Sequence, residues 1–329
     1  MWHDEAVIRR RLFLTAAAAA LPSWLAAQPT FPAKAIRIVV PFGAGGIADL
    51  TARAVGQQLS EQLGQPVVID NKPGAGGVGA GEQVARAEAD GHTLLLMSNG
   101  TAVSAGLFRK LPFDAQKDFA PVGLIGTFDL AILVPEGSKL RSLADLLAQV
   151  RAQPGKLNIA TVAVGSTQNL AAELFKTTAG IDAQVVPFNG TPAVVTALRS
   201  GEVDAAVEIL GPVKTQVTAK ALRALAVLGD KRPPGLPDVP TAGETGGSLA
   251  GFQVASWNAL AAPAATPREV VARLNRELQA ALANAQLKRK LADLNVEARP
   301  GTPEQLAGLL ASEIQRWGDV IARAKVPRQ

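Results

Sequence analysis

Short apolar runs rich in branched residues alternate along the chain with segments in which apolar residues recur every three or four positions. The first pattern is typical of buried strands, and the second of helices that pack one face on a core. The alternation continues almost throughout, which predicts an α/β fold with mainly parallel sheets. Strands are expected at residues 36–40, 66–70, 94–98, 130–134, 157–161, 184–188, 203–209, 222–228 and 252–261.

Helices are predicted between these strands and at the end of the chain. Apolar residues from Leu50 to Leu63 form a stripe that stops at Gly64. Three later helix starts place Thr before Pro, which predicts Thr caps with Pro in the first turn. The expected helices cover residues 50–63, 78–87, 143–150, 267–284 and 303–324, and others begin at 166–167 and 191–192. The Thr-Pro starts are Thr191, Thr266 and Thr302, and Glu269 and Gln305 would complete capping boxes at the last two.

The length and the repeated alternation indicate two lobes. The first lobe is expected to contain residues 28–128, and the second residues 129–250. The tail, residues 251–329, is predicted to return to the first lobe. Residues 229–247 are rich in Pro and Gly and are interpreted as a long surface connection.

The N-terminal segment has the layout of an export signal. A basic start at residues 9–11 precedes an alanine-rich apolar run over 12–21, and small residues follow at Ala26 and Ala27. The run is shorter than the ~20 residues that a membrane-spanning helix needs. We therefore predict a signal peptide over residues 1–27, with cleavage near Ala27. The pair Arg10-Arg11 resembles a twin-arginine signal, so the Tat and Sec routes both remain open.

Composition narrows the possible chemistry. The chain has no Cys, no Tyr and only 2 His, which argues against disulfides, thiol nucleophiles, His-based metal sites and Ser-His-Asp triads. His92 stands directly before a strand and is interpreted as a packing residue. The formal net charge is +5. No run of Lys and Arg is interleaved with aromatic residues, so we expect no nucleic-acid partner.

Glycine-rich or small polar loops follow five of the predicted strands, at residues 42–48, 73–77, 98–101, 165–167 and 189–191. Since ligands bind at the carboxyl ends of strands in open α/β sheets, we expect these loops to converge in a cleft between the lobes. Backbone N–H groups and helix N-termini favour a bound anion. These loops contain no Arg, so amides, hydroxyls and ordered water would hold it.

The predicted ligand-binding residues are Phe42, Gly43, Ala44, Gly45, Gly46, Asp49, Gly76, Gly77, Ser98, Ser166, Thr167, Thr191 and Glu208. Two of them carry competing interpretations. Asp49 lies in the first turn of its helix, where it could cap the helix locally or contact the ligand. Glu208 ends a strand, where it could be solvated or could face a ligand amino group or a crossing segment.

Two enzymatic alternatives remain open. Residues 43–48 fit G-x-G-x-x-A after a strand, and Asp70 ends the next strand, as in dinucleotide-binding folds. That pattern would make the protein an exported NAD(P)-dependent oxidoreductase. The export signal, the interposed Pro41 and Phe42, and a second glycine loop after Asp70 weigh against it. An exported hydrolase using Ser166 or Ser98 is the weaker alternative, because His is nearly absent.

Several segments, in order, resemble the Bug-type receptors, which are the periplasmic substrate-binding proteins of tripartite tricarboxylate transporters. The segments are residues 31–42 with Gly45, Gly46 and Asp49, and residues 71–77, 90–95, 237–241 and 262–267. The resemblance implies a two-lobed Venus-flytrap fold of type II, a periplasmic location and a small carboxylate ligand. That ligand would be a di- or tricarboxylate, an amino acid or an aromatic acid. The partners would be integral membrane transporter subunits.

The resemblance also implies a binding protein without a cofactor or catalysis, and we expect a monomer. In the family the two glycine loops and the Ser/Thr helix start of the second lobe surround the ligand. Here those positions are residues 42–49, 74–77, 166–167 and 191. The chain departs from the family pattern in three places, with Gln168-Asn169 where His is common, His92 where Tyr is common, and Glu208.

Overall fold

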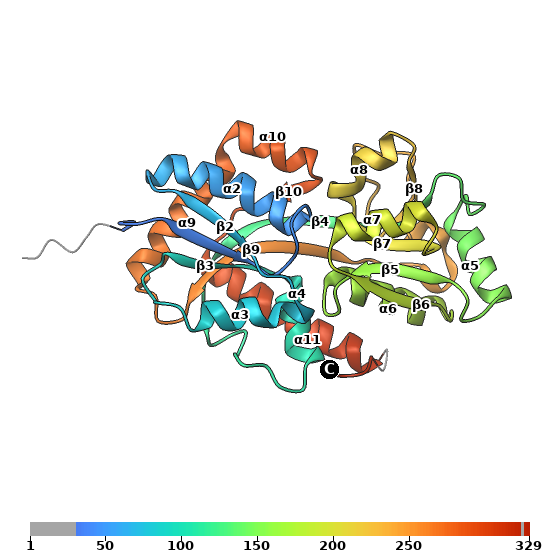
Figure 1. Ribbon diagram of the computed structural model, residues 1–329, viewed down its shortest axis with the longest axis horizontal. Coiled ribbons are helices and arrows are strands. Elements are labelled where there is room, and N and C mark those ends of the chain that lie inside the picture. The colour runs from blue at the N-terminus through green and yellow to red at the C-terminus, as the bar shows by residue number, and fades with distance from the viewer. Residues whose placement is uncertain (1–30, 324–325) are drawn as a thin grey trace, which may run out of the picture.

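The computed structural model describes residues 31–323 and 326–329, so the predicted signal peptide lies outside the described residues. The molecule is elongated, with two groups of strands and helices arranged along its long axis (Figure 1). One ten-stranded sheet runs through both groups in the order β2-β1-β3-β9-β4-β7-β5-β6, and β8 and β10 also pair with β4. The α/β fold predicted from the alternation is confirmed.

The outer strands of each group are parallel, as predicted. β1 (Ile36–Val40) pairs with β2 (Val67–Asn71) and β3 (Thr93–Ser98). In the second group, β5 (Asn158–Val162) pairs in the same way with β6 (Gln184–Phe188) and β7 (Ala205–Ile209).

The central strands are antiparallel, and for them the prediction of a mainly parallel sheet is wrong. β4 (Phe119–Pro135) passes from one group to the other as a single strand, and β9 (Ala255–Pro263) returns beside it. The pairing with β9 ends at Asp129, and the pairing with β7 begins at Leu130. β8 (Leu222–Val227) and β10 (Val296–Ala298) are antiparallel to β4 as well.

Helices cover the sheet in both groups (Figure 1). The C-terminal segment returns to the first group, where α9 and α10 pack on α2, and α11 packs on α4. The helices are α2 (Ile47–Leu63), α3 (Val78–Ala85), α4 (Asn99–Leu107), α5 (Leu143–Ala152), α6 (Thr167–Ala179), α7 (Thr191–Ser200), α8 (Leu210–Thr218), α9 (Arg268–Ala283), α10 (Ala285–Asp293) and α11 (Pro303–Arg323). Three single 3-10 turns are η1 (Ala75–Gly77), η2 (Gly243–Thr245) and η3 (Gly247–Leu249).

The predicted helix caps are partly wrong. Thr302 and Gln305 do form a capping box. The N-cap of α7 is Gly190, which makes Thr191 the first helical residue. The N-cap of α9 is Pro267, and the Thr266 hydroxyl is buried with no hydrogen-bond partner among the described residues.

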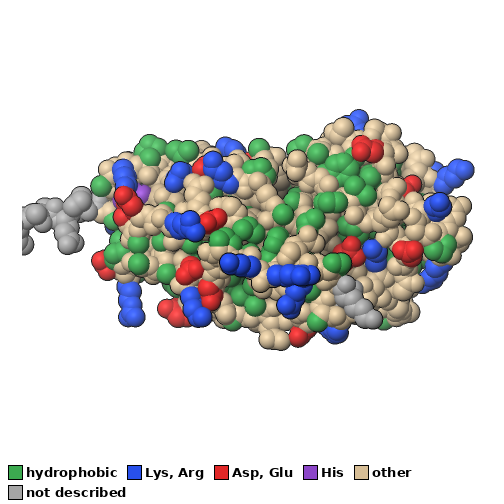
Figure 2. Space-filling model, turned by 60° about the horizontal axis from the view of Figure 1, so that its bottom comes forward, with side chains coloured by type: hydrophobic (Ala, Val, Ile, Leu, Met, Phe, Trp, Pro, Cys, Tyr) green, Lys and Arg blue, Asp and Glu red, His purple; other side chains and the backbone are tan. Residues whose placement is uncertain are grey.

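The surface carries both charge signs. On the face that Figure 2 displays, basic and acidic side chains are intermingled and do not form a field of one sign. Over residues 31–323 and 326–329, the protein contains no helix with the length and hydrophobicity that crossing a membrane requires.

Candidate functional site

A cavity that is partly open to solvent lies between the two groups of strands, with about 400 Å³ of space when the open solvent at its mouth is included. The first group contributes the loop after β1, the end of β3 and part of β9. The second group contributes the end of β5 and the starts of α6 and α7. The lining residues are Phe42, Gly43, Gly46, Ile47, Ala48, Ser98, Phe128, Val162, Thr167, Gln168, Gly190, Thr191, Ile209, Ser256 and Asn258.

Three helices begin at this cavity. The first residues of α2, α6 and α7 are Ile47, Thr167 and Thr191, and all three line it. The first N–H groups of a helix have no partner within the helix, and together they carry about half a positive charge. No Lys or Arg is among the lining residues that the structure describes. The cavity can therefore hold an anion through backbone dipoles and hydroxyls without a salt bridge.

Two predicted site residues hold these helix starts in place. Asp49 Oδ2 accepts from the Gly45 amide at 3.0 Å, and Arg53 pairs with Oδ1 at 2.8 Å. Burial acts to raise the pKa of Asp49, but the contacts with Arg53 and Gly45 outweigh it and lower that pKa. Ser166 accepts from the Asn169 amide at 3.1 Å and donates to a carbonyl of β5. Asp49 therefore fixes the loop that leads into α2 and does not line the cavity.

β9 supplies two polar side chains that the sequence reasoning missed. Ser256 and Asn258 lie two residues apart, on one face of the strand, and both line the cavity. The Ser256 and Thr167 hydroxyls are 2.9 Å apart. Asn258 Nδ2 is buried with no hydrogen-bond partner in the described part of the chain, so it can donate to a bound acceptor. Two polar residues at a spacing of two within an apolar strand were the available signal.

Gln168 and Glu208 form a buried pair at the same cavity. Gln168 Nε2 donates to Glu208 Oε1 at 2.8 Å, and the Ile209 amide donates to the same oxygen at 2.7 Å. Glu208 is 0% exposed, so the interpretation of a solvated strand-end acid is wrong. Burial raises the pKa of Glu208, against the lowering effect of the hydrogen-bonding groups of Gln168, Ile209 and Thr191.

The second glycine loop lies beside this cavity. Gly76 and Gly77 line a neighbouring cavity with about 280 Å³ of empty space, which shares Phe42 and Ser98 with the first. Ala44 is exposed. Of the predicted residues, the main cavity brings together Phe42, Gly43, Gly46, Ser98, Thr167 and Thr191. Ala44, Gly45, Asp49, Gly76, Gly77, Ser166 and Glu208 do not line it.

The side chains that the oxidoreductase and hydrolase alternatives require have structural roles. Ser98 Oγ accepts from the Gly100 amide at 3.1 Å as the cap of α4, and Ser166 has the same role on α6. His92 Nε2 accepts from the Ala33 amide, and its ring packs on Phe31. This confirms His92 as a packing residue. Asp70 lies near Arg37 and Lys72 and does not line the cavity.

The family model of the tripartite tricarboxylate transporter family receptor matches residues 51–326. The chain belongs to this receptor family. A curated relative, the UPF0065 protein in the tcbD-tcbE intergenic region of Pseudomonas sp. strain P51, is 38% identical over 97% of this chain and 95% of its own.

Two solved structures of such receptors are similar along nearly the whole chain. Periplasmic binding protein BugD superposes with a TM-score of 0.87 at 30% identity, over 91% of this chain and 100% of its own. MatC from Rhodopseudomonas palustris, solved with bound malate, superposes with a TM-score of 0.84 at 36% identity, over 88% and 100%. The two-lobed receptor fold is thus confirmed. The protein is a solute-binding receptor and not an enzyme, so the oxidoreductase and hydrolase alternatives are wrong.

Proposed function

We propose that this receptor captures a small carboxylate and presents it, as a monomer, to the membrane subunits of a tripartite tricarboxylate transporter. The observation that carries the proposal is the convergence of three helix N-termini on one cavity, with no Lys or Arg among the described residues that line it. Helix ends stabilise a carboxylate while leaving it chemically unchanged. The malate bound in MatC makes a dicarboxylate the first ligand to test.

We propose further that two lobes close on the ligand. They would consist of residues 28–128 with 251–329, and of residues 129–250. The change of partner along β4, from β9 at Asp129 to β7 at Leu130, supports this boundary. A hinge there would let each half of the sheet move as a rigid unit, and closure would be favoured by the ligand's higher affinity for the closed state.

Thermal unfolding of the purified protein with a panel of acids tests the proposal. The panel contains malate, succinate, adipate, citrate, aspartate, glutamate and benzoate, with NAD and NADP as non-carboxylate comparisons. At 100 times its dissociation constant, a ligand adds about 2.7 kcal/mol to the unfolding free energy. We expect at least one acid to raise the unfolding temperature. Failure of every acid to do so would refute the proposal, whether or not NAD or NADP produces a shift.

The proposal includes export and removal of residues 1–27. The mass of the protein recovered from a periplasmic fraction should correspond to a chain that begins at Gln28. Replacing both Arg10 and Arg11 by Lys separates the two routes, because the Tat route requires the arginine pair and the Sec route requires only positive charge. Recovery of the unaltered protein at full length from the cytoplasmic fraction would contradict the export proposal.

A further inference from the structure

The buried pair formed by Glu208 and Gln168 has a feature that packing alone does not explain. Glu208 Oε1 accepts two hydrogen bonds, whereas its Oε2 is buried with no partner among residues 31–323 and 326–329. Burying a carboxyl group in this way costs stability. Gln168 lines the cavity, and Thr191 and Ile209 on either side of the pair line it too. The acid therefore stands directly behind the cavity wall.

Glu208 determines which end of the Gln168 amide is available to a ligand. A side-chain amide carries donors on its nitrogen and an acceptor on its oxygen. Gln168 Nε2 lies 2.8 Å from Glu208 Oε1. Inverting the amide would bring its oxygen against Glu208 Oε1, which already accepts from the Ile209 amide at 2.7 Å. Two acceptors would then face each other when the carboxyl is ionised or carries its proton on Oε2, so the observed orientation is the favoured one.

The free end of the amide is its oxygen. Gln168 Oε1 accepts no hydrogen bond from the described residues, and it is not one of the buried side-chain atoms that lack a partner. It is therefore accessible, and the cavity is the space that Gln168 lines. The helix N–H groups and Asn258 Nδ2 are donors, whereas the lining hydroxyls can either donate or accept and Asn258 Oδ1 can accept. Gln168 adds an acceptor whose direction is fixed by Glu208.

We infer that Glu208 is a positioning residue that fixes the Gln168 oxygen toward the ligand and thereby selects carboxylates that carry a hydroxyl or amino donor. The inference rests on the proposed function and specifies its ligand class. The helix ends hold a carboxylate of the ligand, and Gln168 Oε1 accepts from its hydroxyl or ammonium group. A plain diacid is disfavoured, because a second carboxylate near Gln168 would meet an acceptor with a buried acid behind it.

Matched ligand pairs test the inference by isothermal titration calorimetry. Succinate is compared with malate and with aspartate, propionate with lactate, and 3-phenylpropionate with phenyllactate. Within each pair the carboxylate and the carbon chain are kept while a donor is added. One hydrogen bond to a neutral acceptor corresponds to about a tenfold change in affinity. We expect the donor-bearing member of the pair that fits the cavity to bind at least tenfold more tightly.

Two substitutions of Glu208 separate positioning from charge. Glu208→Gln keeps an oxygen that can accept from Gln168 Nε2 and the Ile209 amide, so the preference for the donor-bearing ligand should survive. Glu208→Met removes the acceptor and frees the amide, so the ratio of the two affinities should fall toward one. Gln168→Met removes the ligand-facing oxygen while leaving β7 unaltered, and should lower the ratio in the same way. Glu202→Gln, at an exposed acid just before β7, is the matched control and should keep the wild-type ratio.

The outcomes distinguish this inference from the proposed function. If wild-type protein binds carboxylates with equal affinity for both members of a pair, the inference is wrong and the proposed function stands. The inference is also wrong if Glu208→Met or Gln168→Met keeps the preference, or if Glu208→Gln loses it as fully as Glu208→Met does. If no acid of any pair or of the larger panel binds, the proposed function itself fails.

Discussion

The Gly76 amide donates to the Val164 carbonyl at 2.8 Å, which joins the second glycine loop to the loop that follows β5. Gly165 completes this contact, because a Cβ added there would lie 2.9 Å from Gly76 Cα. Backbone atoms from the two groups of strands thus touch directly beside the cavity. Glycine at position 165 permits this approach, and any side chain there would hold the two loops apart.

Gly165→Ala should therefore weaken ligand binding by at least tenfold. The added methyl group opposes the contact with Gly76 and so disfavours the closed arrangement, which the ligand must then restore at the expense of its affinity. Residue 165 also has a φ of +82°, so the substitution should lower the unfolding free energy by about 1–2 kcal/mol. Calorimetric titration with the acid that binds wild-type protein measures the first effect, and urea unfolding the second.

Gly180→Ala is the matched control for this substitution. Gly180 ends α6 with a φ of +62°, and a Cβ there would meet no atom within 4 Å. It should share the backbone strain of Gly165→Ala and keep the wild-type affinity. Equal affinities in the two variants would show that the contact between Gly165 and Gly76 does not govern binding.

Thr167→Val should lower ligand affinity about five- to tenfold. The Thr167 hydroxyl lies 2.9 Å from that of Ser256, so the substitution removes a hydroxyl from the cavity wall and leaves Ser256 unpaired. Losing one such hydrogen bond costs about 1–1.5 kcal/mol. Thr177→Val, on the exposed side of the same helix, is the control and should leave the affinity unchanged. Calorimetric titration measures the ligand affinity of both variants. Identical affinities would contradict a role for Thr167 in binding.

The sequence predicted the fold well in segments where the local residue pattern matches the surroundings of those residues in the folded protein. The run from Ile36 to Val40 forms β1 at the predicted residues, and the apolar stripe of α2 faces the core. β4 was predicted only for its last third. Its earlier part contains Pro121, Gly123 and Gly126, which favour turns, and the strand accommodates them at irregularities in its pairing with β9.

The first turn of α4 lies in the predicted loop at residues 98–101, and no helix was predicted after it; Asn99 and Gly100 are weak helix formers. Two interactions stabilise it nonetheless. Ser98 caps its first turn, and Asn99 Oδ1 accepts from Trp317 Nε1 at 2.8 Å across 218 residues of sequence. α8 was missed as well, because it follows β7 with no intervening loop. Contacts this distant in the chain leave no trace in a local pattern.

The candidate site, like the fold, was predicted from the sequence only in part. The rule that loops converge at the carboxyl ends of strands was sufficient to find Gly43, Ser98, Thr167 and Thr191, because topology alone brings them together. Ser256 was missed, since its position depends on β9 pairing with β4 and β3. When the neighbouring strands are unknown, the alternation of residues along a strand does not reveal which of its two faces lies against a cavity.

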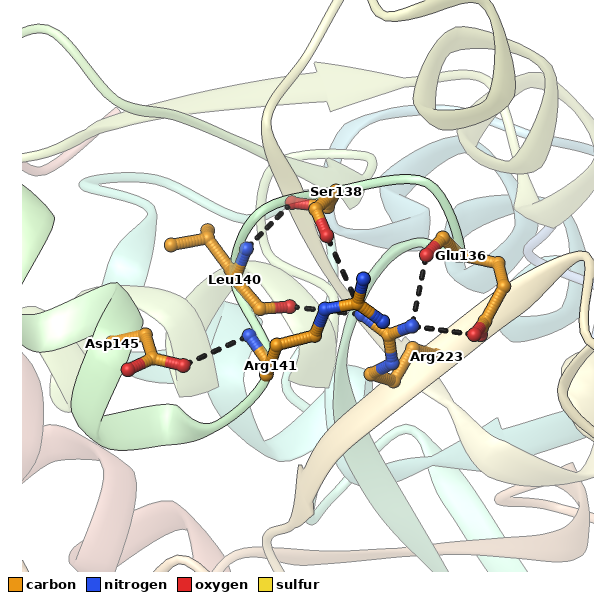
Figure 3. A network of polar contacts seen from close by, with 6 residues as sticks. All are labelled: Glu136, Ser138, Leu140, Arg141, Asp145 and Arg223. Atoms are coloured by element: carbon orange, nitrogen blue, oxygen red, sulfur yellow. Dashed lines mark hydrogen bonds and ion pairs between the residues drawn. The ribbon is translucent and has the colours of Figure 1, made fainter.

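Arg223 stabilises a loop that does not line the cavity, so its replacement should change the stability of the protein without changing ligand binding. Its guanidinium donates to the carbonyls of Glu136, Ser138 and Leu140, and it also pairs with the Glu136 carboxylate (Figure 3). Arg223→Lys keeps the charge, but an ammonium group cannot reach all these acceptors at once. We expect a loss of about 2 kcal/mol in unfolding free energy with unchanged ligand affinity. Exposed Arg199→Lys should change neither quantity, and a weaker affinity in Arg223→Lys would contradict the separation.

Glu208 should make the protein less stable as the pH rises. Burial raises the pKa of its carboxyl group above the usual value of 4.5, so the folded state retains a proton that the unfolded chain has already released. Stability then falls with increasing pH from about 4.5 until the folded-state pKa is passed. Glu208→Gln removes this dependence because an amide does not titrate. Urea unfolding of both proteins at pH 5, 6, 7 and 8 should show wild type losing stability relative to the variant as the pH rises from 5, until the folded-state pKa is passed. The exposed control Glu202→Gln should run parallel to wild type, and a difference between wild type and Glu208→Gln that stays constant with pH would contradict the buried titration.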